Sequence, residues 1–189
     1  MLRWTYVLIG LISLPLLISA FKKDTFPNQS ISETNLAFCK ILNHEVQSFL
    51  ESVKEKEDKS KLEVHYFKTR EAYKKVETYS VFRYPVLDKA INGGPVPSIK
   101  TDVVIIHKDD PSGLQVIEEL MAEAPIDYEE LFYQLKYLKG NTSKLEKAYK
   151  NQTLENWEIL EANHMAITRL ITLSLSGFDS PIYLNAIED

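Results

Sequence analysis

One stretch decides the fold: LAFCKILNHEVQSFLESV, residues 36–53. Its apolar side chains recur at intervals of three and four residues, which is the spacing of one face of an α-helix. These side chains are Leu36, Cys39, Leu42, Val46, Phe49, Leu50 and Val53. Ser32 stands before them as a suitable N-cap, so the pattern predicts a helix from about Ser32 to Glu57.

Outward from this stretch, the same apolar spacing predicts four more helices. They cover residues 62–83, 112–124, 128–139 and 143–176, and each is followed by a breaker: Pro85, Pro125, Gly140 or Gly177. A sixth helix is predicted to begin at Pro181 and to be incomplete, because only eight residues follow it to Asp189. We therefore expect an all-α, antiparallel bundle of about five to six helices, truncated at its C-terminus.

Residues 84–111 are predicted to form one long loop, since they hold most of the helix-breaking residues. The breakers are Pro85, Gly93, Gly94, Pro95, Pro97 and Pro111. Residues 103–106 are four apolar residues, too few to decide whether a short strand lies within the loop. A loop of this length is often functional, so Asn92, Gly93, Pro95 and Pro97 are candidate docking residues. A structural crossover between two helices is the alternative.

The first twenty residues have the features of a secretory signal peptide. Arg3 is followed by an uncharged run from Trp4 to Ala20, which ends in small residues. The predicted organisation is therefore a signal peptide, residues 1–20, and a helical bundle domain, residues 21–189. An N-terminal anchor is the alternative, because a spanning helix needs about 20 apolar residues. We expect a periplasmic location, with an inner-membrane tether only if residues 4–20 are uncleaved.

Composition and motifs exclude several classes of function. With 22 basic and 27 acidic residues and a net charge of −5, the chain has no basic segment that would bind nucleic acid. The single cysteine, Cys39, rules out a disulfide framework, a cysteine zinc site and a c-type haem attachment, and we expect it to be buried. His164 lies on the apolar stripe of the 143–176 helix, so we expect a core histidine rather than a haem ligand. The sequence has no motif for a catalytic nucleophile or a phosphate-binding loop.

Two predicted helices carry the residues of a candidate ligand or metal site. Arg70 and Glu77 share a face of the second helix, and Gln115 and Glu118 share a face of the third. If the two faces meet, Arg70 could hold a carboxylate in a bidentate pair. The result would be a small polar pocket for a metal, an anion or a haem propionate. The alternative is an ion-pair network that only fixes the packing.

Four segments occur in the same order as in a known family. They are REAYKKVE (70–77), NGGPVP (92–97), PSGLQVIEE (111–119) and LSLSGFDSP (173–181). Together they resemble the imelysin-like helical region that precedes the haem domains in some bacterial di-haem cytochrome c peroxidases of the MauG type. The resemblance covers the chain from about Ser60 to its end.

This resemblance implies a periplasmic parent protein whose following part binds haem c and reduces peroxide. The present chain, which has no catalytic or haem-attachment residue, would be its accessory domain, and its partners would be those haem domains or a periplasmic redox partner. Relatives carry a Gly-x-His-x-x-Glu motif linked to metal or iron; Gly113 and Glu118 match it, but Gln115 replaces the histidine. Glutamine is a poor ligand for transition metals. A stand-alone, imelysin-like module that binds iron, another metal or haem is the alternative function.

Overall fold

The stretch that decides the fold forms most of helix α2, which spans Asn28–Lys54 in the computed structural model. The structure describes residues 28–100 and 107–174. The predicted apolar face of α2 lies in the core, where Leu42, Val46 and Phe49 are fully buried. Helix α3 (Lys59–Arg83) then runs back along α2. Its N-cap is Asp58, whose carboxylate accepts a hydrogen bond of 3.1 Å from the Lys61 N–H.

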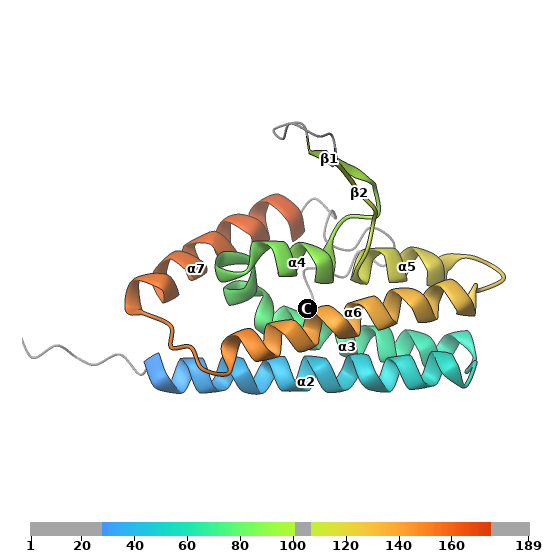
Figure 1. Cartoon of the computed structure of the whole chain (residues 1–189), viewed down its shortest axis with the longest axis horizontal. Helices are drawn as coiled ribbons and strands as arrows, with labels where there is room; N and C mark the ends of the chain where they lie inside the picture. Colours follow the sequence, from blue (N-terminus) through green and yellow to red (C-terminus); the bar gives the residue numbers. More distant parts are fainter. Residues whose placement is uncertain (1–27, 101–106, 175–189) are drawn as a thin grey trace, which may run out of the picture.

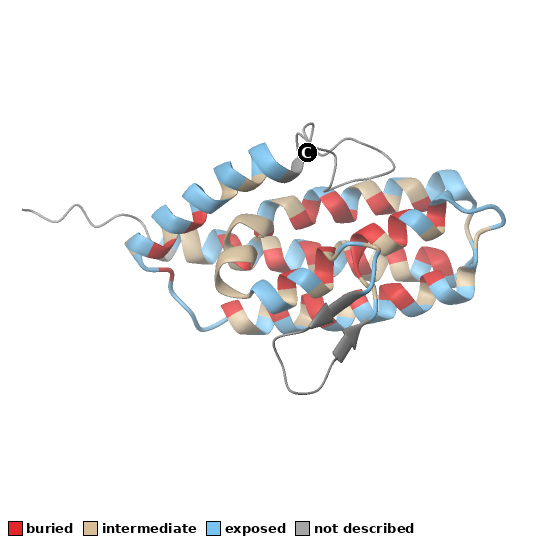
Figure 2. Ribbon diagram, turned by 90° about the horizontal axis from the view of Figure 1, so that it is seen from above, coloured by how far each residue is buried: buried red, intermediate tan, exposed pale blue. Residues whose placement is uncertain are grey.

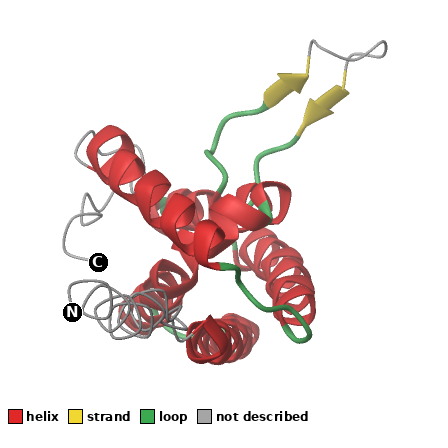
Figure 3. Cartoon of the chain, turned by 90° about the vertical axis from the view of Figure 1, so that its left-hand side faces the viewer, coloured by secondary structure: helices red, strands yellow, loops and turns green. Residues whose placement is uncertain are grey.

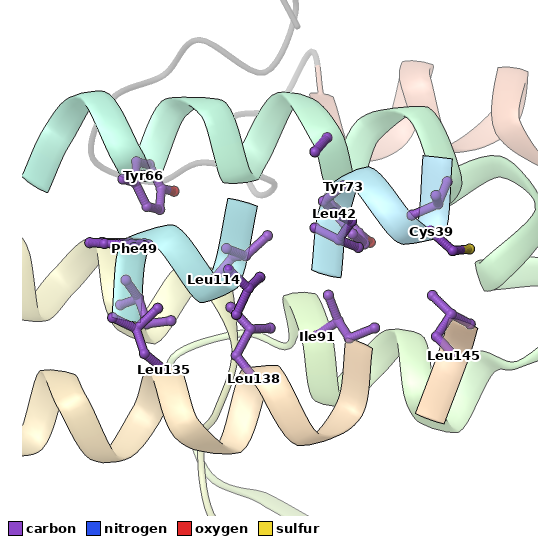
Figure 4. Close-up of a cluster of buried hydrophobic side chains, with 14 of the residues drawn as sticks. Cys39, Leu42, Phe49, Tyr66, Tyr73, Ile91, Leu114, Leu135, Leu138 and Leu145 are labelled. Atoms are coloured by element: carbon purple, nitrogen blue, oxygen red, sulfur yellow. The ribbon is translucent and has the colours of Figure 1, made fainter. Parts of the chain in front are cut away.

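A third long helix, α6 (Tyr128–Tyr149), packs against α2, and the short helix α5 (Leu114–Ala122) lies against α3 and α6 (Figure 1). Their leucines meet the aromatic side chains of α2 and α3 in one core (Figure 4). The described residues contain six α-helices, which confirms the prediction of an all-α helical bundle with five to six helices.

The predicted long loop contains structure that the sequence analysis did not anticipate. Pro85 ends α3, as predicted, but it also occupies the first turn of helix α4 (Pro85–Asn92). Proline is favourable there because the first N–H groups of a helix have no partner within the helix. Strands β1 (Ser98–Lys100) and β2 (His107–Asp109) follow and form an antiparallel hairpin that projects away from the helices (Figure 3). The undecided strand at 103–106 lies outside the described residues.

The predicted helix end at Gly140-Asn141 is wrong, because α6 continues through both residues to Tyr149. A glycine inside a helix costs about 1 kcal/mol relative to alanine. Tertiary contacts offset this cost: Asn141 and Leu145 are buried in the bundle, and Lys139 donates a hydrogen bond of 2.6 Å to the backbone carbonyl of Asn43 on α2. The local breaker is therefore overridden by packing.

The predicted single helix over residues 143–176 is also wrong, because the chain is not helical between the end of α6 at Tyr149 and the start of α7 at Asn156. Leu154, in the connecting segment, is buried in the core, and its N–H donates a hydrogen bond of 2.9 Å to the Ser32 hydroxyl. Helix α7 (Asn156–Arg169) and a π-helical turn, η1 (Leu170–Ser174), follow. A capping box between Glu155 and Glu158 begins the new helix.

Helix α7 packs against α3 and leaves its other side open to solvent (Figure 2). Within α7 only Glu158 and Ala162 are buried. The apolar stripe that the sequence analysis assigned to one buried face is therefore buried at Leu145 and Tyr149 but exposed at Leu160. Periodicity predicted the stripe correctly but not the direction that its second half faces.

Two predictions concern the ends of the chain, which lie beyond the described residues. The signal peptide or anchor at residues 1–20 and the incomplete helix from Pro181 both lie there. Within residues 28–100 and 107–174, no helix combines the length and apolar character that crossing a membrane requires.

Candidate functional site

Arg70 and Glu118 lie in one buried cluster with Tyr66. Tyr66 and Arg70 are one turn apart on α3, Glu118 comes from α5, and all three side chains are fully buried. The Tyr66 hydroxyl donates a hydrogen bond of 3.0 Å to Glu118 Oε2. Figure 4 shows the Tyr66 ring among core side chains, including Phe49 of α2. Arg70 and Glu118 are two of the four predicted site residues, and Tyr66 is an addition to them.

The charges of Arg70 and Glu118 both affect the pKa of the Tyr66 hydroxyl. Burial raises the pKa of Tyr66 well above its ordinary value, and the negative charge of Glu118 raises it further. The positive charge of Arg70 acts in the opposite direction and stabilises the ionised form. A buried carboxylate is costly unless a cation and hydrogen-bond donors surround it, and here both are present. The arrangement can therefore fix the packing of α5 against α3.

Gln115 belongs to a different contact. Its side-chain amide donates a hydrogen bond of 3.4 Å to the backbone carbonyl of Asn92, at the end of α4. The donor set around Glu118 also does not suit a metal ion, since it combines a hydroxyl that donates, a guanidinium that repels cations and a glutamine turned elsewhere. In the described part of the chain, no three His, Cys, Asp or Glu side chains gather at distances suited to a metal.

Glu77 lies in a second cluster, where it joins α3 to α7. Its carboxylate pairs with Lys74 Nζ at 3.1 Å and with Arg169 Nη2 at 2.8 Å. The Tyr73 hydroxyl lies 3.3 Å from Glu77 Oε1. The four candidate residues therefore do not form one pocket: Arg70 and Glu118 meet at Tyr66, whereas Glu77 and Gln115 have other partners.

Asp88, on α4, completes the second cluster and was missed by the sequence analysis. Its Oδ1 accepts hydrogen bonds from the Ser80 hydroxyl at 2.6 Å and the Tyr73 hydroxyl at 3.1 Å. Burial, reinforced by the nearby charge of Glu77, raises the pKa of Asp88 to about 6, although both hydrogen bonds and Arg169 favour the ionised form. The only sequence signal was a lone acid one turn after Pro85, within a segment that was predicted to be a loop.

The candidate docking residues divide between a structural junction and an exposed segment. Asn92 is buried and pairs with Gly113 in an isolated β-bridge. A side chain at Gly93 would place its Cβ 2.4 Å from the Lys89 carbonyl oxygen. Pro97 is exposed and Pro95 half-buried where the chain leaves for the hairpin. Asn92 and Gly93 therefore belong to the junction where the chain leaves the helices for the segment 93–112, here called the excursion. Pro95 and Pro97 are the residues available to a partner.

The predictions for Cys39 and His164 have opposite outcomes. Cys39 is buried and free, as predicted, and burial together with the charge of Glu146 raises its thiol pKa to about 12. His164 is not a core residue, because its side chain is 79% exposed on the outer side of α7 and lies 3.9 Å from the Glu161 carboxylate. The apolar stripe that contains His164 faces solvent, which the spacing alone could not indicate.

Comparisons with models of known families, with curated proteins and with solved structures gave no significant match.

Proposed function

We propose that the chain is an exported, non-catalytic helical accessory module that positions the haem domains of a periplasmic di-haem cytochrome c peroxidase. The proposal joins the resemblance of residues 70–181 to one observation in the structure, the exposed apolar side of α7. An isolated domain normally buries the apolar stripe of a surface helix. An accessory domain must instead keep one apolar surface for the part that it positions.

Support for this proposal comes from the kind of side chain that α7 exposes. Trp157, Leu160 and Ile167 on α7, and Ile171 on the adjoining η1, are each more than half exposed. Tryptophan is among the residues that contribute most to the free energy of association when an interface buries them, and contiguous exposed apolar side chains mark interaction sites. The buried Arg70 and Glu118 contribute to the stability of the bundle in this proposal and take no part in binding.

The experiment is an immunoblot of native periplasm with an antibody against this domain, followed by staining of the same band for haem peroxidase activity. We expect the antibody to detect a haem-positive polypeptide, or a haem-positive complex that survives mild cross-linking. A haem-negative band at the mass of the chain alone, with no cross-linked haem protein, would refute the proposal. A pre-immune serum serves as the control.

The alternative, a module that binds iron, another metal or haem, has weaker support because the donors around Glu118 do not suit a metal. Titration of the purified chain with iron, followed by calorimetry and absorbance, tests it directly. Saturable binding that disappears in Glu118→Gln would favour the alternative over the accessory role.

A further inference from the structure

We propose that the outer side of α7 is a docking surface for one amphipathic helix of a partner protein, with apolar residues at heptad spacing and a basic edge. The identity of the partner as a haem protein rests on the proposed function. The inference that this surface binds a helix rests only on the structure of α7 and the turn that follows it.

The exposed stripe of α7 has the spacing of a coiled-coil seam. We call it the outer seam, and it consists of Trp157, Leu160, His164 and Ile167 on α7, continued by Ile171 in the π-helical turn η1. The intervals are three, four, three and four residues, which is the a-and-d pattern by which one helix packs along another. All five side chains are exposed, with Leu160 at 68% and the His164 side chain at 79%. A single regular helix, rather than an irregular loop, matches such a seam.

Helix α7 is attached to the bundle by two ion pairs, by the partly buried Ile159 and by an edge-to-face contact between the rings of Trp157 and Phe82 of α3, whose centroids are 6.0 Å apart. Arg83 Nη1 pairs with Glu158 at 2.9 Å near the start of α7, and Arg169 pairs with Glu77 at 2.8 Å near its end. Ala162 is the only buried apolar residue of α7 between these two ion pairs. The bundle thus holds α7 by polar and apolar contacts, while more than half of each outer-seam side chain stays exposed to solvent.

Charge indicates which helix fits the outer seam. Glu161 is the exposed carboxylate of α7 beside the outer seam, whereas the Glu155 carboxylate caps the start of α7 by accepting a hydrogen bond from the backbone N–H of Glu158. Arg169 is occupied by Glu77 on the inner side, so α7 presents no free basic side chain beside the seam. Lysine or arginine along the edge of the partner helix that faces Glu161 would complement this carboxylate. A second copy of α7 would not supply them, which favours a different protein as the occupant.

The central position of the outer seam adds a further requirement. His164 occupies an a position, and burying its imidazole without a hydrogen bond would cost free energy. The partner helix must therefore place a polar side chain opposite His164. A single polar pair of this kind would also set the register of the two helices.

The test uses the full chain with Trp4→Phe, so that Trp157 is the only tryptophan and its fluorescence reports on the outer seam. The probes are two designed peptides of three heptads, with isoleucine at a, leucine at d and asparagine opposite His164. One peptide carries lysine along the edge that faces Glu161, and the other carries glutamate there. We expect the lysine peptide to shift the Trp157 emission to shorter wavelength and to bind about tenfold more tightly than the glutamate peptide.

Two variants make the test specific. Ile167→Glu should weaken binding of the lysine peptide by at least about tenfold, because it places a charge in the middle of the seam. Tyr133→Glu changes an exposed apolar residue on α6 and should leave binding unchanged. The proposal is overturned if neither peptide binds, if both bind equally, or if Tyr133→Glu weakens binding as much as Ile167→Glu.

Two further results would overturn the proposal. One is a concentration-dependent dimer in sedimentation velocity that Ile167→Glu dissociates, because the occupant would then be a second copy. The other is protection of Trp157 from acrylamide quenching in the monomeric chain, because the seam would already be covered. If the lysine peptide binds as expected but the periplasmic immunoblot shows no haem protein, the proposed function fails and this inference stands.

Discussion

Replacing Asp88 with asparagine should make the stability of the protein less dependent on pH. Folding raises the pKa of Asp88 from 3.8 to about 6, mainly because the carboxyl group is buried. The folded state therefore favours the protonated form of Asp88. A raised acid pKa stabilises the fold fully below the unfolded pKa, and this contribution is lost as pH rises through the folded pKa. The window is about pH 4 to 6.

The magnitude follows from the size of the shift. A shift of about two pKa units at 1.36 kcal/mol per unit corresponds to about 3 kcal/mol in the free energy of unfolding. Asparagine keeps the shape of the side chain and an oxygen that can accept the hydrogen bonds from Ser80 and Tyr73, but it is never charged. We expect Asp88→Asn to match the wild type near pH 4 and to be more stable by up to about 3 kcal/mol at pH 8.

The assay is urea unfolding followed by circular dichroism at unit steps from pH 4 to pH 8. The quantity of interest is the difference in unfolding free energy between Asp88→Asn and the wild type, since the contributions of titrating groups distant from Asp88 cancel in it. Glu71→Gln, at an exposed position on α3, is the control and should show no such trend. A difference that stays constant with pH, or a variant that is less stable than the wild type at pH 8, would refute the reasoning.

Three further predictions concern other parts of the bundle. Tyr66→Phe removes the hydroxyl that bonds the buried carboxylate and should lower the free energy of unfolding by about 1–3 kcal/mol in urea, while Tyr133→Phe at the surface should change it little. Gly113 has φ +103° and a Cβ there would lie 2.5 Å from a carbonyl oxygen, whereas a Cβ at Gly140 would meet nothing within 4 Å. Gly113→Ala should therefore lower the melting temperature. Gly140→Ala should raise it, with a gain of about 0.5–1 kcal/mol in the free energy of unfolding. Melting temperatures that shift in the same direction for both variants would contradict this. The Cys39 thiol should react with a disulfide reagent at pH 8 only in urea concentrations that unfold the chain, since rapid reaction of the native protein is incompatible with its burial and raised pKa.

The parts of the fold that sequence predicted well are those where one physical signal dominates. The apolar spacing around Leu42 and Phe49 placed α2, and the burial of Cys39 followed from the same spacing. Predictions of helix ends were wrong where a local sequence signal competed with a second effect. Pro85 predicts a helix end, but proline also favours a helix start, and Gly140 predicts a stop that core packing overrides.

The candidate site was predicted less completely, because it depends on contacts between distant segments. Spacing places Arg70 and Glu118 each on a definite helical face, and in the structure both lie beside Tyr66, whereas Glu77 and Gln115 have other partners. Asp88 could not be found without knowing that α4 folds back against Tyr73 and Ser80 of α3. The exposure of the outer seam could not be predicted for the same reason. Periodicity defines an apolar stripe, but only the packing of the neighbouring helices decides whether the stripe faces the core or the solvent.

The junction between Asn92 and Gly113 has a consequence for how this protein could change during evolution. The bridge joins the two points where the chain leaves the bundle after α4 and re-enters it before α5. Because these ends already meet, the length of the intervening segment adds little to the entropic cost of closing it. The excursion could therefore be shortened, lengthened or exchanged for an unrelated module without disturbing the helices. For protein engineers, it is a natural place to insert a reporter domain.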